Sequence, residues 1–239
     1  MYVDPLAAAV PFYDLLHEDG HVPLVRELLP PLLDGVRHGV LEIGAGTGLV
    51  TEVIARSAPG EIYALEPSLG MRSVLLSRLA ADPPLRRRVT VLPCGALDAD
   101  VDEPVDAVVM ISVLQNFPAA ERAGLWEVLA RQLRPGGRLV FNWRDRAAPV
   151  PGGLEPIGSY EVGRHTYEVA AQVLDVAGES VTSRFVYRVR QRGVVISEEE
   201  TIGTNHRPPA AVLATELKER GFTWSPAPDG MQLWQLPGA

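Results

Sequence analysis

Apolar and polar positions follow two alternating periods along the first 143 residues. Continuous apolar runs, typical of strands buried on both faces, alternate with stretches that carry apolar residues at helical spacing. The runs that predict strands occupy residues 39–44, 61–67, 89–93, 104–114 and 137–143. The stretches that predict helices occupy residues 12–16, 23–36, 48–58, 71–81 and 119–133. This order predicts an α/β fold with a doubly wound, mostly parallel sheet, in which ligands bind beyond the carboxyl ends of the strands.

The period changes after Trp143. Strict alternation and β-branched residues predict three antiparallel strands, a helix and a final antiparallel pair that completes a seven-stranded sheet. These segments are residues 165–176, 181–191, 194–202, 208–221, 222–227 and 231–236. We therefore expect a single domain over residues 1–239, with a helical lid at 1–36. The antiparallel stretch, 150–208, is expected as an insertion over the sheet edge or the ligand cleft.

Composition and charge argue against some classes of binding partner. Hydrophobic residues make up 46% of the chain and charged residues 22%, as in an ordinary soluble protein. The net charge of −8 argues against a nucleic-acid partner, which needs a basic face. No apolar run reaches the length of a membrane span, and no leader pattern opens the chain. The single cysteine, Cys94, excludes a disulfide framework and a cysteine zinc site, and fits a cytoplasmic location.

The stretch VLEIGAGTGLV joins the first predicted strand to its helix. Gly44, Gly46 and Gly48 leave the backbone open to a ligand, and the helix that follows points free N–H groups at it. Dinucleotides and S-adenosylmethionine both use such a turn. The dinucleotide pattern requires a glycine where Leu49 stands, which counts against the first of these ligands.

Four stretches in order resemble one family. VLEIGAGTG, IYALEPS, VDAVVMISVLQNF and LRPGGRLVF are similar to the motifs of class I S-adenosylmethionine-dependent methyltransferases, over roughly residues 40–142. Glu66 lies 20 positions after Gly46 (66 − 46), where a carboxylate that binds ribose is expected. The resemblance therefore implies a Rossmann-like methyltransferase with S-adenosylmethionine as its cofactor.

The resemblance also implies roles for single residues. The three glycines would form the floor under the methionine part of the cofactor, Glu42 would hold its amino end, and Glu66 would accept both ribose hydroxyls. Gly95 stands where the family usually has an aspartate, so the adenine contacts fall to neighbouring residues. The full set of expected cofactor residues is Tyr13, Glu42, Gly44, Gly46, Gly48, Glu66, Ala96, Leu97, Asp98 and Ile111. Tyr13 is included as an aromatic that closes over the cofactor from the N-terminal helix.

The layout after the fifth strand resembles that of small-molecule methyltransferases of antibiotic pathways. Many relatives carry histidines where this chain has Gln115 and Asn116, so these two are expected to orient a polar substrate instead. His206 is the candidate general base, because its loop is expected to face the cleft. The other expected substrate residues are Trp143, Arg144 and Arg207, the last of which suits a carboxylate or phosphate.

The sequence thus predicts methyl transfer to an oxygen or nitrogen of a small metabolite. The missing histidine and Gly95 leave an alternative open, a cofactor-binding protein with a non-methylating role as a cyclase or regulatory partner. A nicotinamide-dependent oxidoreductase is a third reading, and a protein substrate is not excluded. The exposed strands of the insertion also suit a homodimer, since a free sheet edge must be covered or paired.

Overall fold

The computed structural model describes residues 4–238 and contains two sheets. The larger sheet has seven strands in the order β10-β11-β5-β4-β1-β2-β3, and β1 to β5 are parallel. Its strands are β1 (Gly39–Ile43), β2 (Glu61–Leu65), β3 (Val89–Leu92), β4 (Val105–Met110), β5 (Leu133–Asn142), β10 (Thr223–Ser225) and β11 (Met231–Gln235). Strand β11 runs antiparallel to β5. The predicted seven-stranded, doubly wound fold is confirmed.

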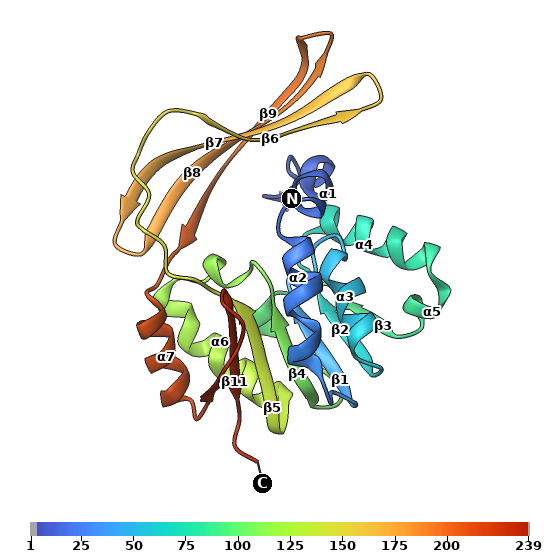
Figure 1. The fold of residues 1–239 in the computed structure, drawn as a ribbon, viewed down its shortest axis with the longest axis vertical. Helices are drawn as coiled ribbons and strands as arrows, with labels where there is room; N and C mark the ends of the chain where they lie inside the picture. Colours follow the sequence, from blue (N-terminus) through green and yellow to red (C-terminus); the bar gives the residue numbers. More distant parts are fainter. Residues whose placement is uncertain (1–3, 239) are drawn as a thin grey trace.

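Helices cover both faces of this sheet (Figure 1). Alternate residues of each strand enter different cores: Leu41 of β1 packs in the cluster that contains Trp126, and Val40 packs with Ile54. The helices are α1 (Val10–Glu18), α2 (Val22–Leu28), α3 (Leu49–Ser57), α4 (Leu69–Ala81), α5 (Pro83–Arg86), α6 (Ala119–Gln132) and α7 (Ala210–Glu219). Short 3-10 turns are η1 (Pro30–Leu33), η2 (Ala96–Asp98) and η3 (Leu114–Asn116). Within the described residues, none of these helices has the length and hydrophobicity that crossing a bilayer requires.

The second sheet is antiparallel, with the order β6-β7-β8-β9, and follows β5 along the chain. Its strands are β6 (Glu155–Val162), β7 (His165–Ala177), β8 (Ser180–Gln191) and β9 (Val194–His206). The sequence predicts three strands here, and the structure has four. Most side chains of β6 are exposed, and its pairing with β7 is interrupted by a bulge after Pro156, so no apolar pattern marks it. Strand β9 has no partner on its outer edge among residues 4–238, and the homodimer stays a prediction.

The antiparallel sheet lies over one end of the seven-stranded sheet, and α1 lies between the two sheets (Figure 1). Phe12 of α1 packs against Tyr167 and Tyr187 of the sheet, with ring centroids 5.4 and 5.2 Å away. At the other end, the buried Arg122 of α6 forms ion pairs with Glu179, in the turn between β7 and β8, and with Glu216 of α7. These contacts fix the sheet above the carboxyl ends of the parallel strands, where a ligand is expected.

Candidate active site

The loop between β1 and α3 has a backbone that side chains would disrupt. Gly44, Gly46 and Gly48 all have positive φ angles, of 71°, 57° and 94°. A Cβ atom on Gly44 would lie 2.5 Å from Cγ2 of Val113, and one on Gly48 would lie 2.6 Å from Cδ1 of Leu75. The backbone conformation therefore favours glycine at all three positions, and close packing also excludes a side chain at Gly44 and Gly48.

Two buried carboxylates flank this loop. Glu66, at the end of β2, accepts hydrogen bonds from the backbone N–H groups of Gly46 (2.9 Å) and Ser68 (2.8 Å). Burial raises the pKa of Glu66 against the effect of these bonds. Glu42, in β1, accepts a hydrogen bond from Oγ1 of Thr51 at 2.6 Å. Burial, with a smaller contribution from the charge of Glu66, raises the pKa of Glu42 to about 7.

The lid helix α1 is attached directly to the glycine loop. The Oγ1 atom of Thr47 donates to Oδ1 of Asp14 at 2.5 Å, and Arg78 of α4 forms an ion pair with the same carboxylate. The adjacent Tyr13 places its hydroxyl 3.5 Å from the position that a Cβ on Gly46 would take. Burial and the nearby carboxylates raise the pKa of Tyr13 to about 12, so its hydroxyl stays protonated. The structure thus places Tyr13 over the loop, as expected.

The segment expected at the adenine ring forms the short turn η2. Ala96 is buried there, while Leu97 and Asp98 are exposed and therefore open to a ligand. Ile111 follows β4 and is buried in the core cluster that also contains Val40. The structure gives Ala96 and Ile111 packing positions, and their contact with a cofactor stays a prediction.

The donor and acceptor set around the loop fits S-adenosylmethionine. Two carboxylates suit its cationic amino group and its ribose hydroxyls, because each oxygen can accept more than one hydrogen bond. At Gly46, a Cβ atom would enter the space beneath the Tyr13 hydroxyl, so the glycine leaves this space free for a ligand. The residues present therefore match the roles that the resemblance implies for Glu42, Glu66 and the glycines.

A cavity of about 560 Å³ opens beside this loop, at the carboxyl ends of β4 and β5. It is lined by His21, Leu24, Val25, Leu28, Ser112, Gln115, Asn142, Trp143, Arg144, Asp145, Arg146, Asn205, Arg207, Pro208, Pro209, Asp229, Gly230 and Met231. Val113 joins the two places: its side chain packs against Gly44, while its neighbour Ser112 lines the cavity.

The structure brings four of the six expected substrate and base residues to this cavity. They are Gln115, Trp143, Arg144 and Arg207. Asn116 is exposed and lies outside the lining. His206 also lies outside it. Its neighbours Asn205 and Arg207 line the cavity, so its loop borders the cleft as expected, but the His206 ring is not part of the lining. Residue 206 is the last of β9, where alternate side chains face opposite sides; its ring Nδ1 lies 3.1 Å from Oγ of Ser180.

Hydrogen bonds fix the floor and one wall of the cavity. Ser112 has a positive φ of 58°, unusual for a residue with a side chain. Its N–H donates to Oδ1 of Asn142 at 2.6 Å, and its carbonyl accepts from Nε2 of Gln115 at 2.6 Å. The indole of Trp143 donates to the carbonyl of Pro208 at 3.2 Å. The strained backbone at Ser112 is held by one partner in β5 and one in η3, and strain of this kind is common at functional sites.

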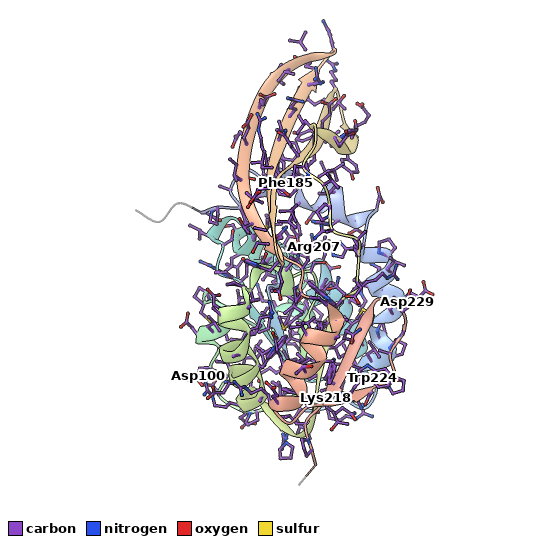
Figure 2. The ribbon with its side chains drawn as sticks, turned by 90° about the vertical axis from the view of Figure 1, so that its left-hand side faces the viewer. Asp100, Phe185, Arg207, Lys218, Trp224 and Asp229 are labelled. Atoms are coloured by element: carbon purple, nitrogen blue, oxygen red, sulfur yellow. The ribbon has the colours of Figure 1, made fainter. Side chains whose placement is uncertain are left out.

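Charged groups line the other side of the cavity. Arg144 forms an ion pair with Asp229 at 2.6 Å, and both side chains are largely exposed. Within residues 4–238, no carboxylate lies at ion-pair distance from the Arg207 side chain. Figure 2 shows Arg207 where the antiparallel sheet joins the core. This guanidinium is therefore available to an anionic group on a ligand.

Sequence reasoning missed two histidines of the lid. His21 lines the cavity, and its ring Nδ1 lies 3.0 Å from Nδ1 of His17. The ring of His17 in turn stacks edge to face on Tyr13, at 4.3 Å between centroids. Tyr13, His17 and His21 recur at a spacing of four residues. Tyr13 and His17 lie on one side of α1, and His21 follows in the turn before α2. That spacing was the signal available in the sequence.

Comparison with known proteins shows which family and which solved structures the chain is similar to. Residues 41–139 match the family described as "Methyltransferase domain". An uncharacterised methyltransferase of Mycobacterium tuberculosis is 34% identical over 131 residues, which is 54% of this chain and 49% of that protein. One from Geobacillus kaustophilus is 27% identical over 125 residues, 51% of this chain and 55% of its own. The chain spans about half the length of the curated relatives it matches.

Solved structures share the whole fold. DesVI of Streptomyces venezuelae has a TM-score of 0.76 at 18% identity, with all of both chains covered. The CcbJ methyltransferase of Streptomyces caelestis has a TM-score of 0.77 at 15% identity and covers 99% of this chain and 100% of its own. The sugar N-methyltransferase KedS8 of Streptoalloteichus has a TM-score of 0.72 at 19% identity, over 94% and 92% of the two chains.

Residues 41–139 of the chain therefore match a methyltransferase domain. The chain as a whole shares its fold with solved methyltransferases.

Proposed function

We propose that this protein transfers a methyl group from S-adenosylmethionine to an oxygen or nitrogen of a small metabolite, in natural-product metabolism. The observation that carries the proposal is the junction at the end of β4. Val113 packs against Gly44 of the cofactor loop, and the adjacent Ser112 lines the cavity. Methyl transfer is a direct displacement, which requires the cofactor and the nucleophile in adjoining sites.

The size and lining of the cavity support a small substrate. A volume of about 560 Å³ lies in the range of small-molecule sites, and the many polar and charged residues of the lining, beside Trp143, suit a polar substrate. The solved structures with this layout include a sugar N-methyltransferase and an amino pentose methyltransferase of calicheamicin biosynthesis. The activities of these two proteins favour a natural-product substrate for this chain.

The residues divide the work as follows. When bound at the loop, S-adenosylmethionine supplies an electrophilic methyl group. Glu42 and Glu66 hold its cationic and hydroxyl groups, and Tyr13 covers the loop and excludes water. Gln115, fixed by Ser112, and Trp143, fixed by Pro208, orient the substrate. Arg207 binds an anionic group on it.

Calorimetry with three ligands tests the cofactor half of the proposal. S-adenosylmethionine and S-adenosylhomocysteine are expected to bind at micromolar affinity, and NAD is not. Glu66→Ala should weaken both by about 10-fold or more, because it removes a charged hydrogen-bonding group. Glu61→Ala is the matched control, since this exposed carboxylate starts the same strand.

The transfer itself is tested with a panel of hydroxylated and aminated metabolites as substrates. Each is incubated with the protein and S-adenosylmethionine, and the S-adenosylhomocysteine that forms is measured. Turnover of any member supports the proposal. Binding of the cofactor without turnover of any member would favour the non-methylating role. Binding of NAD alone would contradict the cofactor assignment.

A further inference from the structure

The two lid histidines form a pair that the cofactor roles leave unused. His17 is in the last turn of α1, and His21 immediately precedes α2. Their Nδ1 atoms are 3.0 Å apart and their ring centroids 4.6 Å apart. Both side chains are half-buried, and His21 lines the cavity. The pair therefore connects the cavity to Tyr13, which lies over the glycine loop.

A hydrogen bond between two Nδ1 atoms fixes the protons of both rings. One ring must donate its Nδ1–H, and the other must accept. Burial lowers the pKa of His21, and burial together with the neighbouring His21 lowers the pKa of His17 to about 4. Both rings are therefore neutral at pH 7. The ring that donates through Nδ1 then carries a lone pair on Nε2, and the ring that accepts carries its proton there.

The charged groups around the pair come from several elements. On the lid, Tyr13 and the exposed ion pair of Glu18 with Arg26 lie nearby in sequence. Across the cavity, the charged groups are Arg144, Asp145, Arg146, Arg207 and Asp229. Among them Arg144 is paired with Asp229, and burial is the cause of the lowered pKa of His21.

We propose that His21 donates its Nδ1–H to His17 and uses its free Nε2 to accept the proton that the substrate loses on methylation. His17 is a positioning residue, which fixes this tautomer and shares the proton across the Nδ1–Nδ1 bond. The inference rests on the proposed methyl transfer. It replaces His206, which faces Ser180, with a residue that lines the cavity.

The step balances without any further reactant. The substrate oxygen forms a bond to the methyl carbon, the carbon–sulfur bond breaks, and its electron pair stays on sulfur. The proton of the substrate hydroxyl passes to Nε2 of His21 and then to solvent.

A weakly basic pair of this kind suits a hydroxyl nucleophile. The oxygen becomes strongly acidic as the bond to carbon forms, whereas an ammonium group keeps its proton at neutral pH. The pair therefore favours oxygen over nitrogen as the methylated atom.

Nitrogen NMR of the full chain tests the tautomers without a known substrate. The protein is labelled with ¹⁵N-histidine, saturated with S-adenosylhomocysteine and measured at pH 7, with His17→Gln and His21→Gln to assign the signals. The expected result is a proton on Nδ1 of His21 and on Nε2 of His17. A proton on Nε2 of His21 would overturn the proposal, because that atom could then accept nothing.

Kinetics with any panel member that turns over give a second, independent readout. His21→Gln should lower kcat by about 100-fold or more, as expected for loss of a general base, with unchanged affinity for S-adenosylhomocysteine. His17→Gln should lower kcat less and shift its pH profile. His165→Gln, at the start of β7, is the control and should change neither. An unchanged kcat in His21→Gln would overturn the inference. A failure of the wild-type protein to bind S-adenosylmethionine would instead overturn the proposed function.

Discussion

The cofactor loop and the substrate cavity lie side by side but are built in different ways. The loop and its two carboxylates come from one continuous segment, residues 42–66, and depend on three glycines with positive φ. The cavity takes its walls from α2, from the segments that follow β4, β5 and β9, and from the turn before β11. A short segment thus specifies the first site, while the second requires the whole chain to be folded.

The loop depends on local backbone conformation, whereas the cavity depends on tertiary packing. At the loop, backbone conformation and close packing exclude every residue except glycine, so the sequence itself displays the site. At the cavity, the antiparallel sheet and α7 must be attached before residues such as Arg207 meet Trp143. Substitutions should therefore disturb the cavity by detaching elements, and the loop by changing local charge or shape.

The largest effect is expected where the sheet is attached to the core. Arg122 is 1% exposed and holds two carboxylates, Glu179 at 2.8 Å and Glu216 at 2.9 Å. Arg122→Ala removes the shared cation and should lower the free energy of unfolding by about 3 kcal/mol. Urea denaturation measures this change.

A matched control is available on the same helix. Arg131 pairs with Glu127 four residues earlier, and both side chains are more than half exposed. Arg131→Ala should cost less than about 0.5 kcal/mol. Equal losses in the two variants would show that Arg122 contributes as an ordinary surface cation and that the sheet is attached by other contacts.

A smaller, pH-dependent effect is expected at the loop. The pKa of Glu42 rises from 4.5 to about 7 on folding, so the folded protein binds its proton more tightly than the unfolded chain. The stabilisation that this gives is fully present below about pH 4.5 and is lost as the pH rises through about 7. Without cofactor, Glu42→Gln should be more stable than the wild type by about 2 kcal/mol at pH 8, and should match it at pH 4.5.

Urea denaturation at the two pH values measures this difference. Glu61→Gln, on an exposed carboxylate of β2, should show no comparable change between them. The affinity of the wild type for S-adenosylmethionine should rise between pH 6 and 8, because the ionised carboxylate binds the amino group. The free energy of unfolding could instead change with pH in the same way in the wild type and in Glu42→Gln up to pH 8. That result would show that Glu42 is ionised throughout this range.

Most of the fold is predictable from the sequence because the parallel strands are buried on both faces. β4, for example, exposes little beyond Asp106, which caps the turn before β1 by accepting from the N–H groups of Arg37 and His38. β6 escapes prediction because its side chains are mostly exposed and its pairing depends on β7, which follows it in the chain. Tertiary pairing, rather than local pattern, makes it a strand.

The site residues also fall into two groups, those that can be predicted from the sequence and those that depend on tertiary structure. Glu66 and the glycines follow from spacing alone, since the loop is local. The sequence favours His206 because its loop borders the cleft, but the ring of His21 lines the cavity and that of His206 does not. Sequence position does not show which side of the end of β9 a side chain takes. The spacing of four residues from Tyr13 to His17 to His21 indicates that these side chains are neighbours. That they lie near the cavity depends on the position of α1, which the sequence does not show.

The smallest effect on stability is expected at the rim of the cavity. Arg144 and Asp229 form an ion pair at 2.6 Å, but their side chains are 55% and 87% exposed, so water screens the attraction. Arg144→Gln should lower the free energy of unfolding by less than about 0.5 kcal/mol, measured by urea denaturation, and should leave cofactor affinity unchanged. Arg207→Gln, which breaks no ion pair among the described residues, should be equally mild. A loss above about 2 kcal/mol in Arg144→Gln would mean that this rim is held as firmly as Arg122 holds the sheet, and the contrast between these two attachments would fail.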